Sequence, residues 1–430
     1  MLQCGAYEMV ITPVLGVPIP GYFTGRPATG VKDDLYAHAA VLNDGKTTIA
    51  LISMDIIGMS DKMAAAIRER LTEATGIPAE NIMIAATHTH TGAPVDFDLY
   101  YSEADPETAR MLCIKAADCA AIAFRNMKPA KLGFGRGEEY DLGFNRRFIM
   151  KDGTVKTNPG VCNPNLERNA GPVDPEVGVI RIDDGEGKPL AILVNFACHL
   201  DVVGGSEYCA DYPGEMNRIV KKALGNVPVL FFNGCCGDIN HIDFWGKHPV
   251  DRPTHYKKMG RILAGDVLAI REKIATSDDI ELGAASVKLT GDRRQPTESD
   301  VAWAKEYLAA HTDGALTSDR AYAEAYIDLS ENPILTKDFE VQALKIGDVG
   351  ISALPSETFV EIGLDIKANS PFANNFTVEL ANGCLGYVST ALAQEQKGGY
   401  ETRLSRYTYM APRTAKQISG AAVELLNKIH

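Results

Sequence analysis

Five short apolar runs, each followed closely by polar residues, constrain the fold of this chain more than any other feature. Runs of this length, rich in Val, Ile and Leu, are typical of strands that are buried on both faces. They span residues 48–54, 81–84, 190–198, 227–232 and 349–354, and they lead into Asp55, His88, His199, Asp238 and Glu357. Open α/β sheets place their binding sites at the carboxyl ends of strands, so we expect these side chains to converge.

Helical patterns lie between and after these runs. Residues 62–75 and 106–125 carry apolar side chains at helical spacing, and Ile418, Ala422 and Leu425 repeat that spacing near the end of the sequence. We therefore predict an α/β fold, with central, mostly buried mixed β-sheets flanked by helices, in a single domain over residues 1–430.

Two segments depart from this pattern. Residues 144–176 are rich in Asn, Pro and Gly and show little periodicity. They predict a long ordered loop, and loops of that length in compact domains are usually functional. Residues 289–333 are polar and helix-rich, with helices expected at 300–310 and 318–326. We interpret this second segment as a helical insertion.

His88 and His90, one residue apart, form the most informative motif. In an extended segment alternate side chains share a face, so both rings would point the same way at the end of a strand. Together with His199 and Glu357 they could supply ligands to one divalent ion, as in catalytic zinc sites with two His, one Glu and an open position. Structural interpretations stay open for these residues. The histidines could simply be hydrogen-bonded to carbonyls, and Glu357 could lie in the first turn of a helix capped by Ser356.

Six motifs, taken in order, resemble those of the neutral/alkaline (non-lysosomal) ceramidase family. They are Thr87-His88-Thr89-His90-Thr91-Gly92, Asn145-Arg146, Phe196-Ala197-Cys198-His199, Gly237-Asp238-Ile239-Asn240, Pro355-Ser356-Glu357, and Leu380-Ala381-Asn382-Gly383 followed by Gly386-Tyr387-Val388-Ser389-Thr390. Their order and rough spacing hold from about residue 5 to the C-terminus. No single motif is specific, but six in the same order are.

The resemblance implies a catalytic domain that binds one zinc ion per chain. The implied ligands are His88, His199, Glu357 and Tyr387. Tyrosine is not among the common zinc ligands, so Tyr387 rests on the resemblance alone. Its structural alternative is a buried aromatic side chain with a bonded hydroxyl.

The resemblance also implies groups that act on the substrate. His90, Arg146 and Tyr400 would line the reacting amide as catalytic residues. Asn145 and Asp238 lie in the same motifs and are expected to contact the substrate. In a chain with a formal net charge of −13, Arg146 is a conspicuous cation that could clamp a polar substrate group.

Asn240 departs from the family pattern. Ceramidases carry a serine, regarded as catalytic, in the corresponding Gly-Asp-x-Ser segment. Asparagine is not a nucleophile, so an acyl-serine route through this position is excluded. A metal-activated water needs no serine, and we expect Asn240 to act in catalysis by orienting the substrate or donating to the developing oxyanion. Cys235 and Cys236 are interpreted as small buried residues rather than substitute nucleophiles.

The composition limits the kinds of partner that the protein is expected to bind. The net charge argues against nucleic acid and anionic membranes. The sequence ends at His430, without the immunoglobulin-like module of ceramidases or a long apolar segment, so we expect no stable membrane association and a small-molecule substrate more polar than ceramide. The sequence has nine cysteines, an odd number, and its first residues lack the features of a signal peptide, so we expect a cytoplasmic protein. If a signal peptide was removed, the protein would be secreted or periplasmic. The oligomeric state does not follow from the sequence.

The sequence thus predicts a zinc-dependent amidohydrolase that cleaves the N-acyl bond of a small, polar substrate through a metal-activated water. An esterase or lactonase is the first alternative, because such a water attacks esters as readily as amides. A ceramidase-like binding protein that has lost catalysis is the second, and Asn240 is the residue that favours it.

Overall fold

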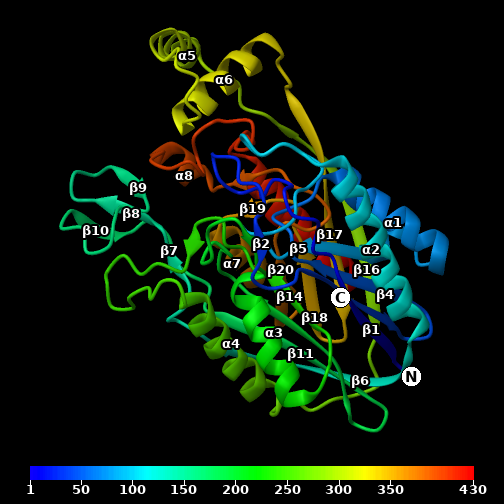
Figure 1. Cartoon of the computed structure of the whole chain (residues 1–430). Coiled ribbons are helices and arrows are strands. Elements are labelled where there is room, and N and C mark those ends of the chain that lie inside the picture. The colour runs from blue at the N-terminus through cyan, green and yellow to red at the C-terminus, as the bar shows by residue number, and fades with distance from the viewer.

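An eight-stranded mixed sheet forms the centre of the computed structural model, which describes all 430 residues and confirms the α/β class (Figure 1). The strand order is β14-β12-β11-β6-β1-β3-β4-β5. The strands are β1 (Gln3–Val10), β3 (Tyr36–Asn43), β4 (Thr48–Met54), β5 (Ile82–Ala86), β6 (Lys128–Glu138), β11 (Glu176–Asp184), β12 (Pro189–Phe196) and β14 (Val229–Asn233). Only the outermost pairs, β4–β5 and β12–β14, are parallel.

A second sheet packs face to face on the first. It has the order β16-β17-β18-β20, with strands β16 (Leu282–Asp292), β17 (Thr336–Ile346), β18 (Val349–Ala353) and β20 (Asn374–Val378). Leu42 and Leu51 of the first sheet share one buried cluster with Leu344 and Ile351 of the second. Side chains alternate along a strand, so Val41, next to Leu42, belongs to the helix-covered cluster on the opposite face.

Helices cover the outer faces and complete an α/β/β/α layering. They are α1 (Asp61–Thr75), α2 (Pro106–Arg125), α3 (Asp211–Leu224), α4 (His255–Arg271), α7 (Val360–Asn369) and α9 (Thr414–Ile429). The first four pack on the large sheet, and α7 and α9 pack on the small one. The helices expected at 62–75 and 106–125 are confirmed as α1 and α2. None of the helices combines the length and the apolar character needed to cross a membrane.

The large sheet curls until its two edges meet. Strand β14, at one edge, contacts β3, β4 and β5 at the other. Ser53 on β4 donates a 2.6 Å hydrogen bond from Oγ to the carbonyl of Phe231 on β14. Strands β1 and β6 pair through Gln3 and Cys4 only, which loosens the middle of the sheet. The loops that follow β5 and β12 therefore lie side by side.

The predicted insertion is a helical hairpin inside a β-hairpin. Helices α5 (Glu298–Ala310) and α6 (Ser318–Glu331) connect β16 to β17, which pair along their whole length. Figure 1 shows both helices projecting beyond the sheets. Thr297 begins α5 in a capping box with Asp300, and Thr317 caps α6. The expectation of helices at 300–310 and 318–326 is confirmed, with α6 longer at its C-terminal end.

The loop predicted at 144–176 is wrong in part. The segment contains β7 (Phe144–Asn145), β8 (Arg147–Met150), β9 (Val155–Thr157) and β10 (Leu166–Asn169), and β11 begins at its end. Strands β10, β8 and β9 form a small sheet, and β7 pairs with β15 (Ile239–Asn240). Strands of two to four residues are too short to show a period in the sequence. The remaining short elements are β2 (Gly30–Val31), β13 (Glu207–Tyr208), β19 (Glu357–Thr358), β21 (Tyr387–Val388), α8 (Ala391–Gln396) and one 3-10 turn (Ala79–Asn81).

Candidate active site

His88 and His90 lie in the loop after β5, and both are buried. The extended geometry expected there is wrong at His88. Its φ of 75° falls in the left-handed region, which residues other than glycine rarely adopt. The two rings nevertheless come together, with their Nε2 atoms 3.4 Å apart. Strained backbone of this kind clusters at active sites and ligand clamps.

His199 reaches the same point from the opposite half of the sheet. It follows β12, and the backbone N–H of His90 donates to the carbonyl of Leu200 over 3.0 Å. The Nε2 atoms of His88 and His199 lie 3.1 Å apart. The curl of the sheet thus joins two motifs that are 111 residues apart in sequence.

Glu357 completes a triangle of donor atoms. Its Oε2 lies 3.3 Å from Nε2 of His88 and 3.2 Å from Nε2 of His199. The alternative that Glu357 occupies the first turn of a helix is wrong, because it lies in β19 and α7 begins only after Phe359. Zinc with bonds of 2.0–2.1 Å in tetrahedral geometry needs ligand atoms about 3.3–3.4 Å apart. The triangle therefore has the size of one face of a zinc site.

The hydrogen bonds around the triangle leave lone pairs facing inward. Nδ1 of His88 lies 2.7 Å from the carbonyl of Ile57, and Nδ1 of His199 lies 3.0 Å from that of Cys236. A carbonyl only accepts, so both Nδ1 atoms carry a proton and donate. Oε2 of Glu357 is buried and has no hydrogen-bond partner. Three electron-rich atoms around one point, with ring orientation fixed from behind, fit a bound divalent cation.

The electrostatics of the site agree with this interpretation. Burial alone would raise the pKa of the Glu357 carboxyl, but His88 and His199 hold it well below its ordinary value. Burial, together with the nearby Arg146, lowers the pKa of His199 to about 3. Burial opposes protonation of His88 as well, yet the Glu357 carboxylate raises its pKa. A proton on His88 can therefore balance Glu357, and a metal ion would displace it.

His90 stands beside the triangle as a third imidazole. The ligand atoms of His88, His90 and His199 all lie within 4.8 Å of one another, so this trio could also hold a metal. Nδ1 of His90 is buried without a hydrogen-bond partner and lies 4.0 Å from Oδ1 of Asp201. The geometry admits His90 as a ligand or as a group acting next to the metal.

Tyr387 and Arg146 meet on the far side of Glu357. Strands β19 and β21 pair in parallel, with Glu357 opposite Tyr387. Nη2 of Arg146 donates to the Tyr387 hydroxyl over 3.1 Å and to the carbonyl of Gly237 over 2.7 Å. Nε of Arg146 donates to Glu401 over 2.8 Å, and both side chains are buried. Arg146 is therefore held rigidly, with Nη1 left without a protein acceptor.

Asn145, Asp238 and Asn240 lie behind the site. The Asp238 carboxylate accepts from Asn145 Nδ2 over 2.7 Å, and its backbone carbonyl accepts from the N–H of Arg146. The Asn240 amide donates to Asn158 over 3.0 Å and accepts from the backbone N–H two residues on. None of the three lines the cavity over the donor triangle. Their predicted substrate contacts stay predictions. In the structure Asp238 bonds the Arg146 backbone directly, Asn145 bonds Asp238, and Asn240 bonds Asn158, whose N–H donates to the Arg146 carbonyl.

A cavity of about 180 Å³ opens over the donor triangle. His88, His90, His199, Glu357, Arg146, Tyr387 and Tyr400 all line it, so the structure brings together seven of the ten residues expected at the site. Most of the remaining wall is aromatic or apolar and comes from Tyr22, Phe23, Ile57, Leu99, Tyr100 and Tyr407. A cavity of this size suits a compact ligand group.

Sequence reasoning missed Tyr407, Tyr22 and Asp201. The Tyr407 hydroxyl donates to Oε1 of Glu357 over 2.6 Å, and the Tyr22 hydroxyl donates to Asp201. Asp201 follows His199 by two residues, the spacing that singled out His90, and that repeat could have identified it. No local pattern marks the two tyrosines.

The adjacent cysteines are confirmed as buried packing residues. Cys235 and Cys236 are 2% and 0% exposed. Burial raises the pKa of both thiols, so neither provides a thiolate at neutral pH. All nine cysteines are free in the structure.

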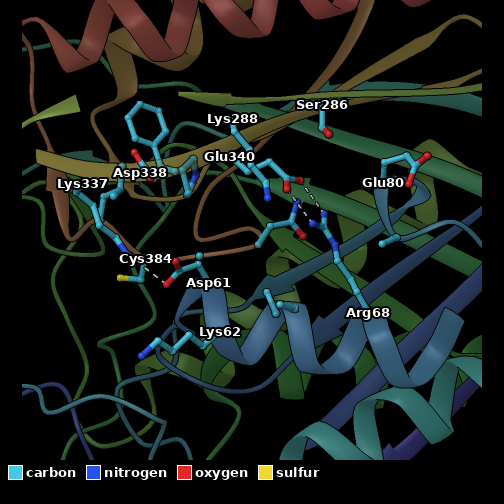
Figure 2. Close-up of a pocket in the computed structure, with 18 of the residues that line it drawn as sticks. Asp61, Lys62, Arg68, Glu80, Ser286, Lys288, Lys337, Asp338, Glu340 and Cys384 are labelled. Atoms are coloured by element: carbon cyan, nitrogen blue, oxygen red, sulfur yellow. Dashed lines mark hydrogen bonds and ion pairs between the residues drawn. The ribbon is translucent and has the colours of Figure 1, made fainter. Parts of the chain in front are cut away.

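A larger groove, of about 700 Å³, lies between α1 and the second sheet, away from the histidines. Figure 2 shows two ion pairs among its charged side chains. Arg68 donates two bonds of 2.9 and 3.0 Å to Glu340, and Lys337 lies 3.3 Å from Asp61. Because the only cluster of potential metal ligands is that of His88, His90 and His199, the smaller cavity is the better candidate site.

Sequence and structure comparisons with known proteins both find similarity to neutral ceramidases. Residues 4–205 match the family profile described as neutral/alkaline non-lysosomal ceramidase, N-terminal. Neutral ceramidase A of Dictyostelium discoideum is 24% identical over 201 residues, 44% of this chain, and the chain spans 26% of the length of that relative. The crystal structure of neutral ceramidase from Pseudomonas aeruginosa matches with a TM-score of 0.72 and 17% identity, covering 100% of this chain and 75% of that one. A ceramidase complexed with C2 matches with a TM-score of 0.75 and 16% identity, covering 100% and 76%.

At these identities the solved structures establish the fold. The order of six sequence motifs, the family profile and the fold agree. Residues 4–205 of this chain are thus similar to the N-terminal domain of the neutral/alkaline non-lysosomal ceramidase family, and the whole chain has the fold of the neutral ceramidases.

Proposed function

We propose that this protein is a zinc-dependent hydrolase that cleaves the amide bond of a small N-acyl compound. The observation that carries the proposal is the triangle formed by His88, His199 and Glu357, whose donor atoms are 3.1, 3.2 and 3.3 Å apart. Both imidazoles direct an Nε2 lone pair into it, and the carboxylate oxygen there has no other partner. We propose Tyr387, which faces the same cavity, as the fourth ligand.

A bound zinc ion would supply a water of lowered pKa and a Lewis acid for the carbonyl oxygen. The protein's own residues would do the rest. Arg146 carries a permanent charge, and its free Nη1 can donate to a substrate oxygen. The Tyr400 hydroxyl and Nε2 of His90 line the same cavity and would pass a proton from the attacking water to the departing nitrogen.

The cavity supports a small substrate. Pockets that hold drug-sized ligands measure about 300–1,000 Å³, whereas this one measures about 180 Å³. The aromatic side chains in its wall favour a compact, partly apolar group next to the amide. We therefore propose short N-acyl compounds rather than long-chain lipids as substrates.

The test is metal content combined with a substrate panel. We expect about one zinc per purified chain, and hydrolysis of short N-acyl amides that a chelator abolishes and added zinc restores. His199→Ala should lose both metal and activity. His255→Ala is the matched control, because that histidine lies at the start of α4, outside the cavity. Absence of zinc from the wild type would refute the metal assignment. Cleavage of esters or lactones alone would identify the protein as an esterase or lactonase. Metal binding without any cleavage would indicate a binding protein.

A further inference from the structure

The α5–α6 insertion contacts the wall of the candidate active site through a series of aromatic rings. Tyr322 of α6 is 4% exposed, and its ring centroid lies 6.0 Å from that of Phe23. Phe23 packs on Tyr100 with centroids 4.1 Å apart, and both rings line the cavity. Tyr100 lies 6.3 Å from Tyr407, the donor to Glu357. The series runs from the insertion to a metal ligand.

Arg403 fastens the insertion to the segment that carries Tyr400. Its guanidinium carbon lies 3.8 Å from the Tyr322 ring centroid and 5.1 Å from that of Trp303 on α5. Nη1 of Arg403 also donates to Asp319 on α6 over 3.1 Å. Because cation–π and ionic contacts reinforce one another here, the insertion is fixed relative to the cavity.

We propose that the insertion sets the size of the acyl group that the cavity accepts. Tyr322, buried behind Phe23, prevents that ring from moving outward to admit a longer chain. Protein interiors are close-packed, so a ring supported from behind does not yield to a few extra methylene groups at low cost. This inference rests on the proposed hydrolysis of N-acyl compounds and adds a size-determining residue to it, with short, unbranched acyl groups as the substrate class.

A series of acyl hydroxamates, from acetyl to dodecanoyl, measures this limit without requiring catalysis, because the hydroxamate binds a metal through its two oxygens. Titration of the zinc-loaded wild type should show affinity rising about fourfold per methylene for the shortest chains and then falling sharply. Tyr322→Ala should move that fall to chains several carbons longer. Phe23→Ala should move it in the same direction while leaving the packing inside the insertion intact.

Two control variants test whether the effect depends on the aromatic ring of Tyr322. Tyr322→Phe retains the ring and should keep the wild-type limit, as should Leu316→Ala in the exposed turn between the two helices. A limit at the same chain length in the wild type, Tyr322→Ala and Phe23→Ala would overturn the inference. Hydrolysis of the matching amides is assayed in parallel. A shifted binding limit with no amide cleavage would support the size limit and reject only the proposed activity.

Discussion

Replacing Tyr407 by phenylalanine should weaken metal binding without changing the fold. The hydroxyl of Tyr407 donates a 2.6 Å hydrogen bond to Oε1 of Glu357, whose side chain is almost completely buried. A hydrogen bond to a charged group contributes about 1.5–3 kcal/mol. At about 1.4 kcal/mol per decade, its loss corresponds to roughly a 10- to 160-fold change in an equilibrium constant. Loss of groups that orient metal ligands typically costs about 10–100-fold in affinity, so we expect the zinc dissociation constant to rise by that factor.

The assay is a competition titration against a chelator of known zinc affinity, with circular dichroism to confirm the fold. Cys384→Ala is the matched control, because the Cys384 thiol lies 3.3 Å from the same Tyr407 hydroxyl but does not contact Glu357. The control should bind zinc as the wild type does. A folded Tyr407→Phe variant with wild-type zinc affinity would refute the reasoning that Glu357 is a ligand oriented by this bond.

Three further substitutions test other parts of the structure. Gly21→Ala would place a Cβ 2.7 Å from Nδ1 of His90 at a φ of 113°, so kcat should fall while zinc is retained; unchanged kcat would show that His90 need not hold its position. Burial raises the pKa of Asp211 to about 7 from its ordinary 3.8. Between these two values the folded state keeps a proton that the unfolded state has lost. The free energy of unfolding should therefore fall as the pH rises from about 4 to about 7, by up to about 1.4 kcal/mol per pH unit. Urea unfolding of Asp211→Asn should show that slope reduced, and an unaltered slope would contradict the assignment. Asn240→Ala loses its bond to Asn158 and should cost about 1–3 kcal/mol of stability with little effect on rate, whereas a fall of about 10²–10³ in kcat would show that Asn240 reaches the substrate.

The sequence by itself determined part of the secondary structure. Apolar runs predicted β4, β5, β12, β14 and β18, helical spacing predicted α1, α2 and α9, and a polar, helix-rich segment predicted α5 and α6. These are local properties, because the side-chain period follows from backbone geometry within a few residues. Short strands in the segment 144–176 escaped prediction, since two to four residues cannot display a period.

The sequence also indicated which residue types could form the site. Histidines at strand ends and a glutamate after β18 have the chemistry of a zinc site, and six ordered motifs pointed to the family. The same motifs also carried Asn145, Asp238 and Asn240, which the structure places behind Arg146 rather than in the cavity wall. A motif records which residues occur together, but it does not distinguish a side chain that faces a substrate from one that supports its neighbour.

Only the tertiary structure decided that the proposed ligands meet. His88 follows the edge strand β5, whereas His199 follows β12, the neighbour of the opposite edge strand β14, and in a flat sheet the two would be far apart. They come within 3.1 Å because the sheet curls until its edges touch, a result of twist accumulated over eight strands that no local pattern encodes. Tyr407 reaches Glu357 from a segment 50 residues further along the chain for the same kind of reason. Local sequence fixes what each strand end offers, while the summed twist and packing of the whole sheet fix which strand ends become neighbours.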